Sequence, residues 1–69
     1  MPKRHGRVKW FNSRKNYGFL VTDEGEEVFV HQHQILDGAP DLNEGQEVRF
    51  HVRYPFKGPE ALNVEVVKG

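Results

Sequence analysis

The 69-residue chain contains no cysteine, so neither a disulfide nor a thiolate metal site can reinforce its fold. Ser13 is its only serine, and no nucleophile has a plausible base beside it in the sequence. The sequence also contains no phosphate-cradling glycine loop, so both observations argue against an enzyme. No apolar run approaches the length of a membrane span. We therefore expect a protein without cofactor, metal, small-molecule substrate or membrane partner.

The start of the chain also lacks the apolar region of a signal peptide, so we expect a cytoplasmic location. At this length the chain is a single domain, residues 1–69, which buries only roughly 60% of its unfolded surface and has marginal stability. Residues 1–5 are polar and are expected to be loose. We expect a monomer.

The formal net charge is zero, but the charges are segregated along the chain. Residues 1–15 contain six basic residues and no acid, whereas residues 16–48 contain eight acids and neither lysine nor arginine. This distribution predicts a basic patch with the acidic loops elsewhere. Ordinary solvated charges at the start of a chain are the alternative.

Alternation of apolar and polar residues predicts five short strands and no sustained helix. The first is expected over residues 7–11, and the others over 17–22, 27–31, 46–54 and 61–67. Turn-forming Asp and Gly in residues 23–26 join the second and third strands as a hairpin, and Asn16 suits a left-handed turn position. Residues 32–36 suit a single helical turn, and a long connection with Leu42 as its one apolar anchor follows.

Flat rings alternate with glycine or aliphatic residues in two runs, Lys15-Asn16-Tyr17-Gly18-Phe19-Leu20 and Val28-Phe29-Val30-His31. Residues two apart in a strand share a face, so Tyr17 lies with Phe19 and Phe29 lies with His31. Such a surface, with lysines nearby, could stack unpaired bases while ammonium groups meet phosphates. The alternative is that the rings form a second core beneath a loop or a partner chain.

Five short antiparallel strands with one long connection suit a small barrel, because closure removes exposed sheet edges. Gly6 and Gly18 would let the first two strands coil. Strict alternation turns Trp10 inward with Val8, so an exposed Trp10 requires a bulge in the first strand. The predicted core comprises Val8, Leu20, Val28, Val30, Ile35, Val48, Phe50, Val52, Val64 and Val66, with Leu62 on the same face of the last strand.

The ordered set of motifs closely resembles the bacterial cold shock proteins over nearly the whole chain. It comprises Gly6-Arg7-Val8-Lys9-Trp10-Phe11-Asn12, the two runs above, Glu44-Gly45-Gln46-Glu47-Val48, Gly58-Pro59 and Asn63-Val64. The resemblance implies an all-β fold, a small five-stranded antiparallel Greek-key barrel of the oligonucleotide-binding (OB) type. It also implies a partner, single-stranded RNA or DNA, and a role as an ATP-independent RNA chaperone in cold-shock-type regulation of transcription or translation.

By this resemblance, eight residues fall at nucleic-acid-binding positions: Lys9, Trp10, Phe11, Lys15, Tyr17, Phe19, Phe29 and His31. Further contacts are expected from Arg7, Asn12, Gln32, Phe56 and Lys57. The chain departs from the family pattern at Asn16, where glycine is usual, and at Gln32 and Ala39, where aromatic residues are usual. The absence of aromatic rings at Gln32 and Ala39 predicts weaker binding or a shorter binding site.

Two other interpretations compete with nucleic-acid binding. A small β-barrel that binds proline-rich peptide would also expose an aromatic face, although such grooves favour acidic flanks and Lys9 and Lys15 border these rings. His31 and His33 invite a metal interpretation, but no third ligand is apparent in the sequence. His51, on the outer face of the fourth predicted strand, is expected to be plain surface.

Overall fold

Five strands and one short 3-10 helix make up the part of the chain that the computed structural model describes, residues 3–36 and 42–67. The elements are β1 (Arg4–Asn12), β2 (Tyr17–Thr22), β3 (Glu27–His31), η1 (Gln32–Gln34), β4 (Glu47–Arg53) and β5 (Glu60–Val66). β2 and β3 have the expected bounds, and the expected helical turn is η1. None of the helical structure in the described ranges has the length and apolar character needed to cross a bilayer.

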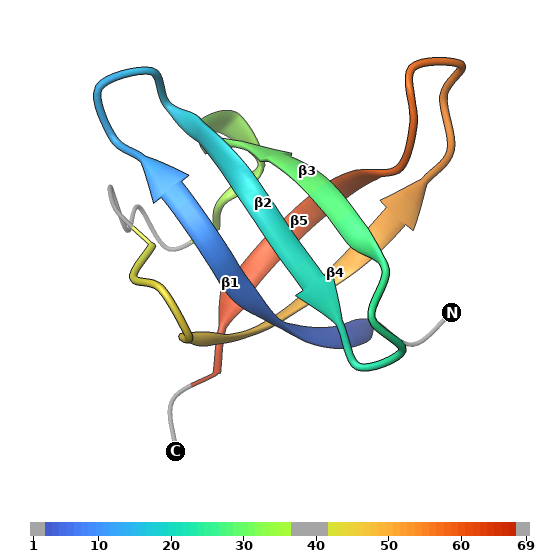
Figure 1. Cartoon of the computed structure of the whole chain (residues 1–69), viewed down its shortest axis with the longest axis horizontal. Helices are drawn as coiled ribbons and strands as arrows, with labels where there is room; N and C mark the ends of the chain where they lie inside the picture. Colours follow the sequence, from blue (N-terminus) through green and yellow to red (C-terminus); the bar gives the residue numbers. More distant parts are fainter. Residues whose placement is uncertain (1–2, 37–41, 68–69) are drawn as a thin grey trace.

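The strands close into a barrel in the order β1-β2-β3-β5-β4, with β4 returning to pair with β1. In Figure 1 the meander β1-β2-β3 lies in front, and β4 and β5 cross behind it. The β1–β2 and β4–β5 connections project at the same end of the barrel (Figure 1). The predicted all-β, five-stranded barrel is confirmed.

One seam of the barrel departs from the expected antiparallel pairing. β3 and β5 meet in parallel, with Phe29 opposite Glu60, and Ile35 forms a further parallel bridge with Val64. This follows from the topology, because β4 is antiparallel to β1 and β5 is antiparallel to β4. β5 must therefore run in the direction of β3.

β1 begins earlier than its sequence pattern indicates. Arg4 pairs with Phe50 and His5 pairs with Arg49, so the prediction that residues 1–5 are loose is wrong for these two residues. Residues 1 and 2 lie outside the described ranges. Pairing with β4, which the local alternation of residues 1–6 does not reveal, extends the strand.

A bulge in β1 reverses its alternation after Val8. Val8 is opposite Leu20, but Trp10 is opposite Phe19, so two residues of β1 face one of β2. Val8 consequently stays buried while Trp10 is 36% exposed. The predicted bend in the first strand is confirmed.

A second bulge, in β5, was not predicted. Arg49 is opposite Glu65 and His51 is opposite Leu62, so β5 advances three residues while β4 advances two. Asn63, with φ 50°, is the extra residue, and asparagine tolerates this left-handed region better than most residues. The prediction that Leu62 shares the inner face with Val64 is therefore wrong: Ala61 is fully buried in its place, and Leu62 is half-buried.

The core lies inside the barrel. Eight of the predicted core residues are buried, namely Val8, Leu20, Val28, Val30, Ile35, Val48, Phe50 and Val64. Val52 and Val66 pack against them but are only partly buried. Leu42 and Ala61 complete the cluster. The aromatic residues of β2 and β3 take no part in it, so the inner space is filled without them.

Candidate nucleic-acid interface

Four aromatic rings, those of Trp10, Tyr17, Phe19 and Phe29, form one group that we call the ring surface. The ring centroids are 5.4 Å apart for Trp10–Phe19, 5.7 Å for Trp10–Tyr17, 5.7 Å for Tyr17–Phe29 and 5.8 Å for Phe19–Phe29. Each ring therefore contacts two others in a closed circuit. The group lies on the outer face of the β1-β2-β3 meander, outside the core cluster, and its members are half-buried or exposed.

Strand register brings these rings together. Phe19 lies directly opposite Phe29 and Tyr17 directly opposite His31, so alternation places all four side chains on one face. The bulge in β1 turns Trp10 to the same face, so β1 also contributes a ring. Gly18 lets β1 approach closely, because a Cβ at this position would run into the Trp10 carbonyl oxygen and lie 2.7 Å from the Phe11 Cα.

Two of the predicted binding residues, Phe11 and Asn12, do not belong to the ring surface and instead make contacts within the fold. Phe11 is half-buried and packs against the core. The Asn12 Oδ1 accepts hydrogen bonds from the backbone N–H groups of Arg14 (2.9 Å) and Lys15 (3.1 Å), and so orders the β1–β2 turn. That turn exposes the Lys15 side chain, and Asn16 in it has φ 62°, as expected.

The predicted separation of basic and acidic residues is wrong. The Arg4 guanidinium lies 3.0 Å from the Glu24 carboxylate and 3.2 Å from that of Glu26, both in the β2–β3 connection. The Lys9 Nζ lies 2.8 Å from the Glu27 Oε2. The basic strand β1 is therefore paired with the acidic hairpin, although the two are separate blocks in the sequence.

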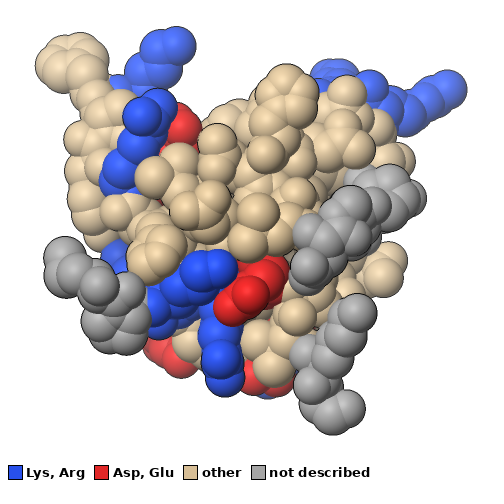
Figure 2. Space-filling view, turned by 180° about the vertical axis from the view of Figure 1, so that it is seen from behind, with Lys and Arg blue, Asp and Glu red and all other residues tan. Residues whose placement is uncertain are grey.

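The far side of the barrel is mixed in charge as well. Figure 2 shows Lys and Arg side chains beside Asp and Glu side chains there. Elsewhere on the barrel, the Lys3 Nζ lies 3.6 Å from the Glu65 Oε1, and the Arg53 Nη2 lies 3.1 Å from the Glu60 Oε1. Arg7, a predicted contact, donates to the Gly45 carbonyl oxygen at 3.1 Å, on the β3–β4 connection.

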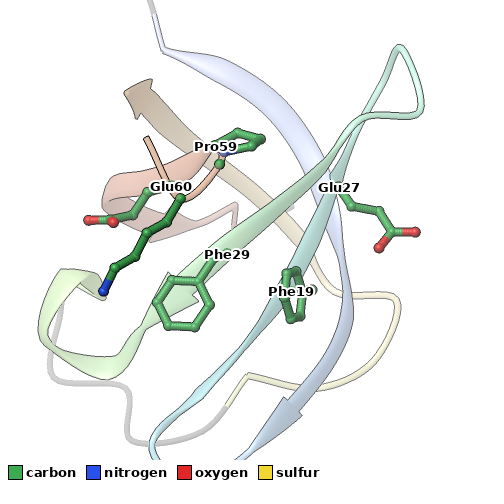
Figure 3. Close-up of a pocket in the computed structure, with 7 residues that line it drawn as sticks. Phe19, Glu27, Phe29, Pro59 and Glu60 are labelled. Carbon is green, nitrogen blue, oxygen red and sulfur yellow. The ribbon is translucent and has the colours of Figure 1, made fainter. Parts of the chain in front are cut away.

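A hollow of about 370 Å³ opens beside two of the rings. Its lining residues are Phe19, Glu27, Phe29, Lys57, Gly58, Pro59 and Glu60. In Figure 3 the two phenyl rings lie between Glu27 on one side and Pro59 with Glu60 on the other. The Phe29 N–H donates to the Pro59 carbonyl oxygen (3.1 Å), which fixes the β4–β5 loop against β3. Phe56, at the tip of this loop, is fully exposed.

Sequence reasoning missed the acidic members of this hollow. Glu27 and Glu60 belong to strands that meet only through the parallel seam, at Phe29 opposite Glu60. No local pattern indicates that contact. The signal that could have found it is topological, since β5 must fill the gap between β3 and β4 in a closed barrel.

His31 is the last residue of β3, and Gln32 is the first residue of η1. The His31 Nδ1 accepts a hydrogen bond from the His33 backbone N–H (3.2 Å), and the Gln32 N–H donates to the Asn16 carbonyl oxygen (2.9 Å). The described residues contain no group of three or more His, Asp or Glu side chains placed to hold a metal ion. Ala39, the other position that lacks the usual ring, lies outside the described residues.

A closed five-stranded barrel with rings on one outer face is the architecture of the oligonucleotide-binding barrels. Residues 4–67 match the family described as the 'Cold-shock' DNA-binding domain. A "Cold shock-like protein" of Thermotoga maritima is 50% identical over 64 residues, which cover 91% of this chain and 97% of the relative. "Cold shock-like protein CspE" of Bacillus anthracis is 52% identical over 60 residues, or 86% of this chain and 90% of the relative.

The chain therefore belongs to the cold-shock domain family, a nucleic-acid-binding rather than enzymatic kind of domain, and the predicted resemblance is confirmed. The solved structure "drosophila Unr CSD456" has the same fold, with a TM-score of 0.80 and 21% identity. The match covers 96% of this chain but 27% of that one, so this chain spans about a quarter of its length.

Proposed function

We propose that this protein binds single-stranded RNA or DNA by stacking bases on the ring surface, and that it acts as an ATP-independent RNA chaperone. The observation that carries the proposal is the closed circuit of four rings on the outer face of three adjacent strands, outside a core that is complete without them. Rings that lie outside the core, each at least partly open to solvent, are available for a ligand with flat faces.

Stacking supplies most of the expected binding energy. A base stacked on an aromatic side chain contributes about 1–3 kcal/mol by alanine substitution, and four rings offer several such positions. Ordering a flexible strand offsets part of that gain. We expect micromolar to sub-micromolar affinity, about −8 to −10 kcal/mol.

The hollow beside Phe19 and Phe29 suits one of the stacked bases. The two phenyl rings provide flat apolar contact, and Lys57 at the loop provides an ammonium group for a neighbouring phosphate. Lys15 is exposed at the β1–β2 turn and can contact a phosphate in the same way.

The chaperone role follows from what the ring surface can reach. Bases in a duplex are paired and stacked on each other, so their faces are closed to protein rings. The protein should consequently hold melted segments and oppose their refolding without ATP. In a cell this activity would serve the cold-shock-type regulation of transcription or translation.

A matched pair of variants tests the stacking mechanism. F19L/F29L keeps apolar side chains but removes two flat rings, and we expect it to lose nearly all affinity for a labelled oligouridine in fluorescence anisotropy. Y54L is the control, because it removes a strongly exposed ring that lies outside the ring surface. Circular dichroism should show the barrel in both. Wild-type affinity in a folded F19L/F29L protein would refute the proposal.

One observation favours the peptide-binding alternative: the carboxylates of Glu27 and Glu60 line the hollow, and such acids suit basic peptides. Competition separates the two functions. With a labelled oligouridine bound, we expect unlabelled oligothymidine to displace it and a basic proline-rich peptide to leave it bound. Binding of the peptide without binding of either oligonucleotide would establish the alternative.

A further inference from the structure

Two imidazoles lie beyond the ring surface, at the end of β3. The ring centroids of His31 and His33 are 4.5 Å apart, with an angle of 52° between the ring planes. His31 lies directly opposite Tyr17 across the β2–β3 pair, so it shares the face of the ring surface. The imidazole pair, His31 and His33, therefore continues the flat surface toward η1.

The backbone fixes this arrangement. His31 is the N-cap of η1, and its Nδ1 accepts the His33 backbone N–H. Gln32 donates to the Asn16 carbonyl oxygen of the β1–β2 turn (2.9 Å), and Leu36 donates to the Val64 carbonyl oxygen of β5 (2.7 Å). The short helix is thus held at both ends, and the direction of the His33 side chain depends on backbone contacts.

The hydrogen bond also defines what His31 offers to a ligand. A ring nitrogen that accepts an N–H carries no proton, so neutral His31 carries its proton on Nε2. Nε2 is then a donor suited to a phosphate or carbonyl oxygen. Moving that proton to Nδ1, which a metal at Nε2 would require, would break the cap, so the pair favours an oxygen ligand over a metal ion.

His33 offers a flat face. Its side chain is exposed, and among the described residues its imidazole makes no hydrogen bond. Gln32, beside it, has no ring, so His33 is the flat side chain that follows His31 along the chain. Arg14 and Lys15 lie in the β1–β2 turn that Gln32 contacts through Asn16, and both side chains are exposed.

We infer that His33 is a nucleotide-contacting residue that lengthens the binding site by one position at the η1 end. Its imidazole stacks on one base, while the His31 Nε2–H donates to an oxygen of the same or the adjacent nucleotide. This inference rests on the proposed function, because it extends the strand bound on the ring surface.

The length of the oligonucleotide provides the test. Affinities of wild type, H33A and H33F are measured by fluorescence anisotropy for oligothymidines of about 3 to 8 nucleotides. We expect H33A to bind the longer strands about 5–20-fold more weakly, because one stacked base is lost, and to bind the shortest strands like wild type. H33F should restore the affinity. Alanine keeps the backbone N–H that caps η1, so the midpoint of thermal unfolding should not change.

H51A is the matched control, since His51 is an imidazole on β4, away from the β2–β3 face. It should behave like wild type at every length. Equal affinities of wild type and H33A at all lengths would overturn the assignment, as would a loss that is the same at every length and accompanied by a lower melting temperature. Failure of the wild-type protein to bind either oligothymidine or oligouridine at any length would instead refute the proposed function itself.

Discussion

The Lys9 ammonium lies 2.8 Å from the Glu27 carboxylate, so a lysine expected to meet phosphates is already paired within the protein. Glu27 also lines the hollow beside Phe19 and Phe29, which places this ion pair at the edge of the ring surface. A bound phosphate must compete with Glu27 for Lys9. Carboxylate and phosphate are thus alternative partners of one ammonium group.

E27Q should consequently bind oligouridine more tightly than the wild-type protein. Both side chains are about half exposed, so the pair itself is weak and we expect a gain of about 2–5-fold at low salt. E65Q is the control, because it removes the same charge beside Lys3, on a different ion pair. Weaker binding by E27Q would mean that the Glu27 carboxylate contacts the bases directly.

The salt dependence of binding should be shallow. If about 2–4 phosphates are neutralised, log K falls with log salt at a slope near −1.5 to −3 for a single strand. Titrations of oligouridine from about 50 to about 500 mM salt, followed by Trp10 emission, measure this slope. A much steeper slope would show that ionic contacts rather than stacking dominate the affinity.

The pH dependence of stability should reflect His5, which joins two elements at one end of the barrel. Its Nδ1 lies 2.9 Å from the Asp23 Oδ2, and its Nε2 contacts the Glu47 carboxylate. The hydrogen bond to Asp23, which has the larger effect, and the hydrogen bond to Glu47 raise the pKa of His5 above its ordinary value. The hydrogen bond to His5 lowers the pKa of Glu47.

A raised pKa in the folded state means that the His5 contribution is complete below the ordinary imidazole pKa and is lost as pH rises through the raised value. The Glu47 contribution is present above the ordinary carboxyl pKa and is lost as pH falls through its lowered value. We therefore expect the melting temperature to fall as the pH rises above the ordinary imidazole pKa of about 6.5 and through the raised pKa of His5. H5Q should flatten that decline, and an unchanged profile in H5Q would contradict the assignment.

G18A should lower the stability of the fold more than G25A does. The added Cβ would meet the backbone of β1 at Trp10 and Phe11, neither of which can move without separating the strands. We expect a loss of about 1–3 kcal/mol or more in urea unfolding. G25A provides the comparison: Gly25 has φ 90° but open space around it, so only backbone strain of about 1–2 kcal/mol applies. A milder effect for G18A than for G25A would contradict the close approach of β1 and β2.

The bulge at Asn63 makes a further stability prediction. Asn63 holds φ 50°, a conformation that costs alanine roughly 1 kcal/mol and glycine very little. We expect N63A to lower the free energy of unfolding by about 0.5–1.5 kcal/mol and N63G to be close to neutral. Equal losses in both variants would point to a contact of the Asn63 side chain rather than to its backbone.

The sequence by itself determined the number of strands, the bounds of β2 and β3, and the face on which the rings of these two strands lie. Alternation is local, because successive side chains of a strand point to opposite faces whatever the strand pairs with. Tyr17 with Phe19, and Phe29 with His31, could therefore be assigned to common faces without a structure. The ordered motifs determined the family. The family resemblance places Trp10 on the binding side, whereas alternation places it inward with Val8, and this conflict predicted the bulge in β1.

Only the tertiary structure decided what those faces meet. Three contacts join residues that are far apart in the chain: Arg4 with Phe50, Phe29 with Glu60, and Lys9 with Glu27. Strand register rather than local pattern sets such contacts. The extra residue at Asn63 reversed the alternation of β5 because the strand had to follow its partner around a closed barrel. Local patterns give the direction of each side chain, whereas the closure of the barrel decides its neighbours.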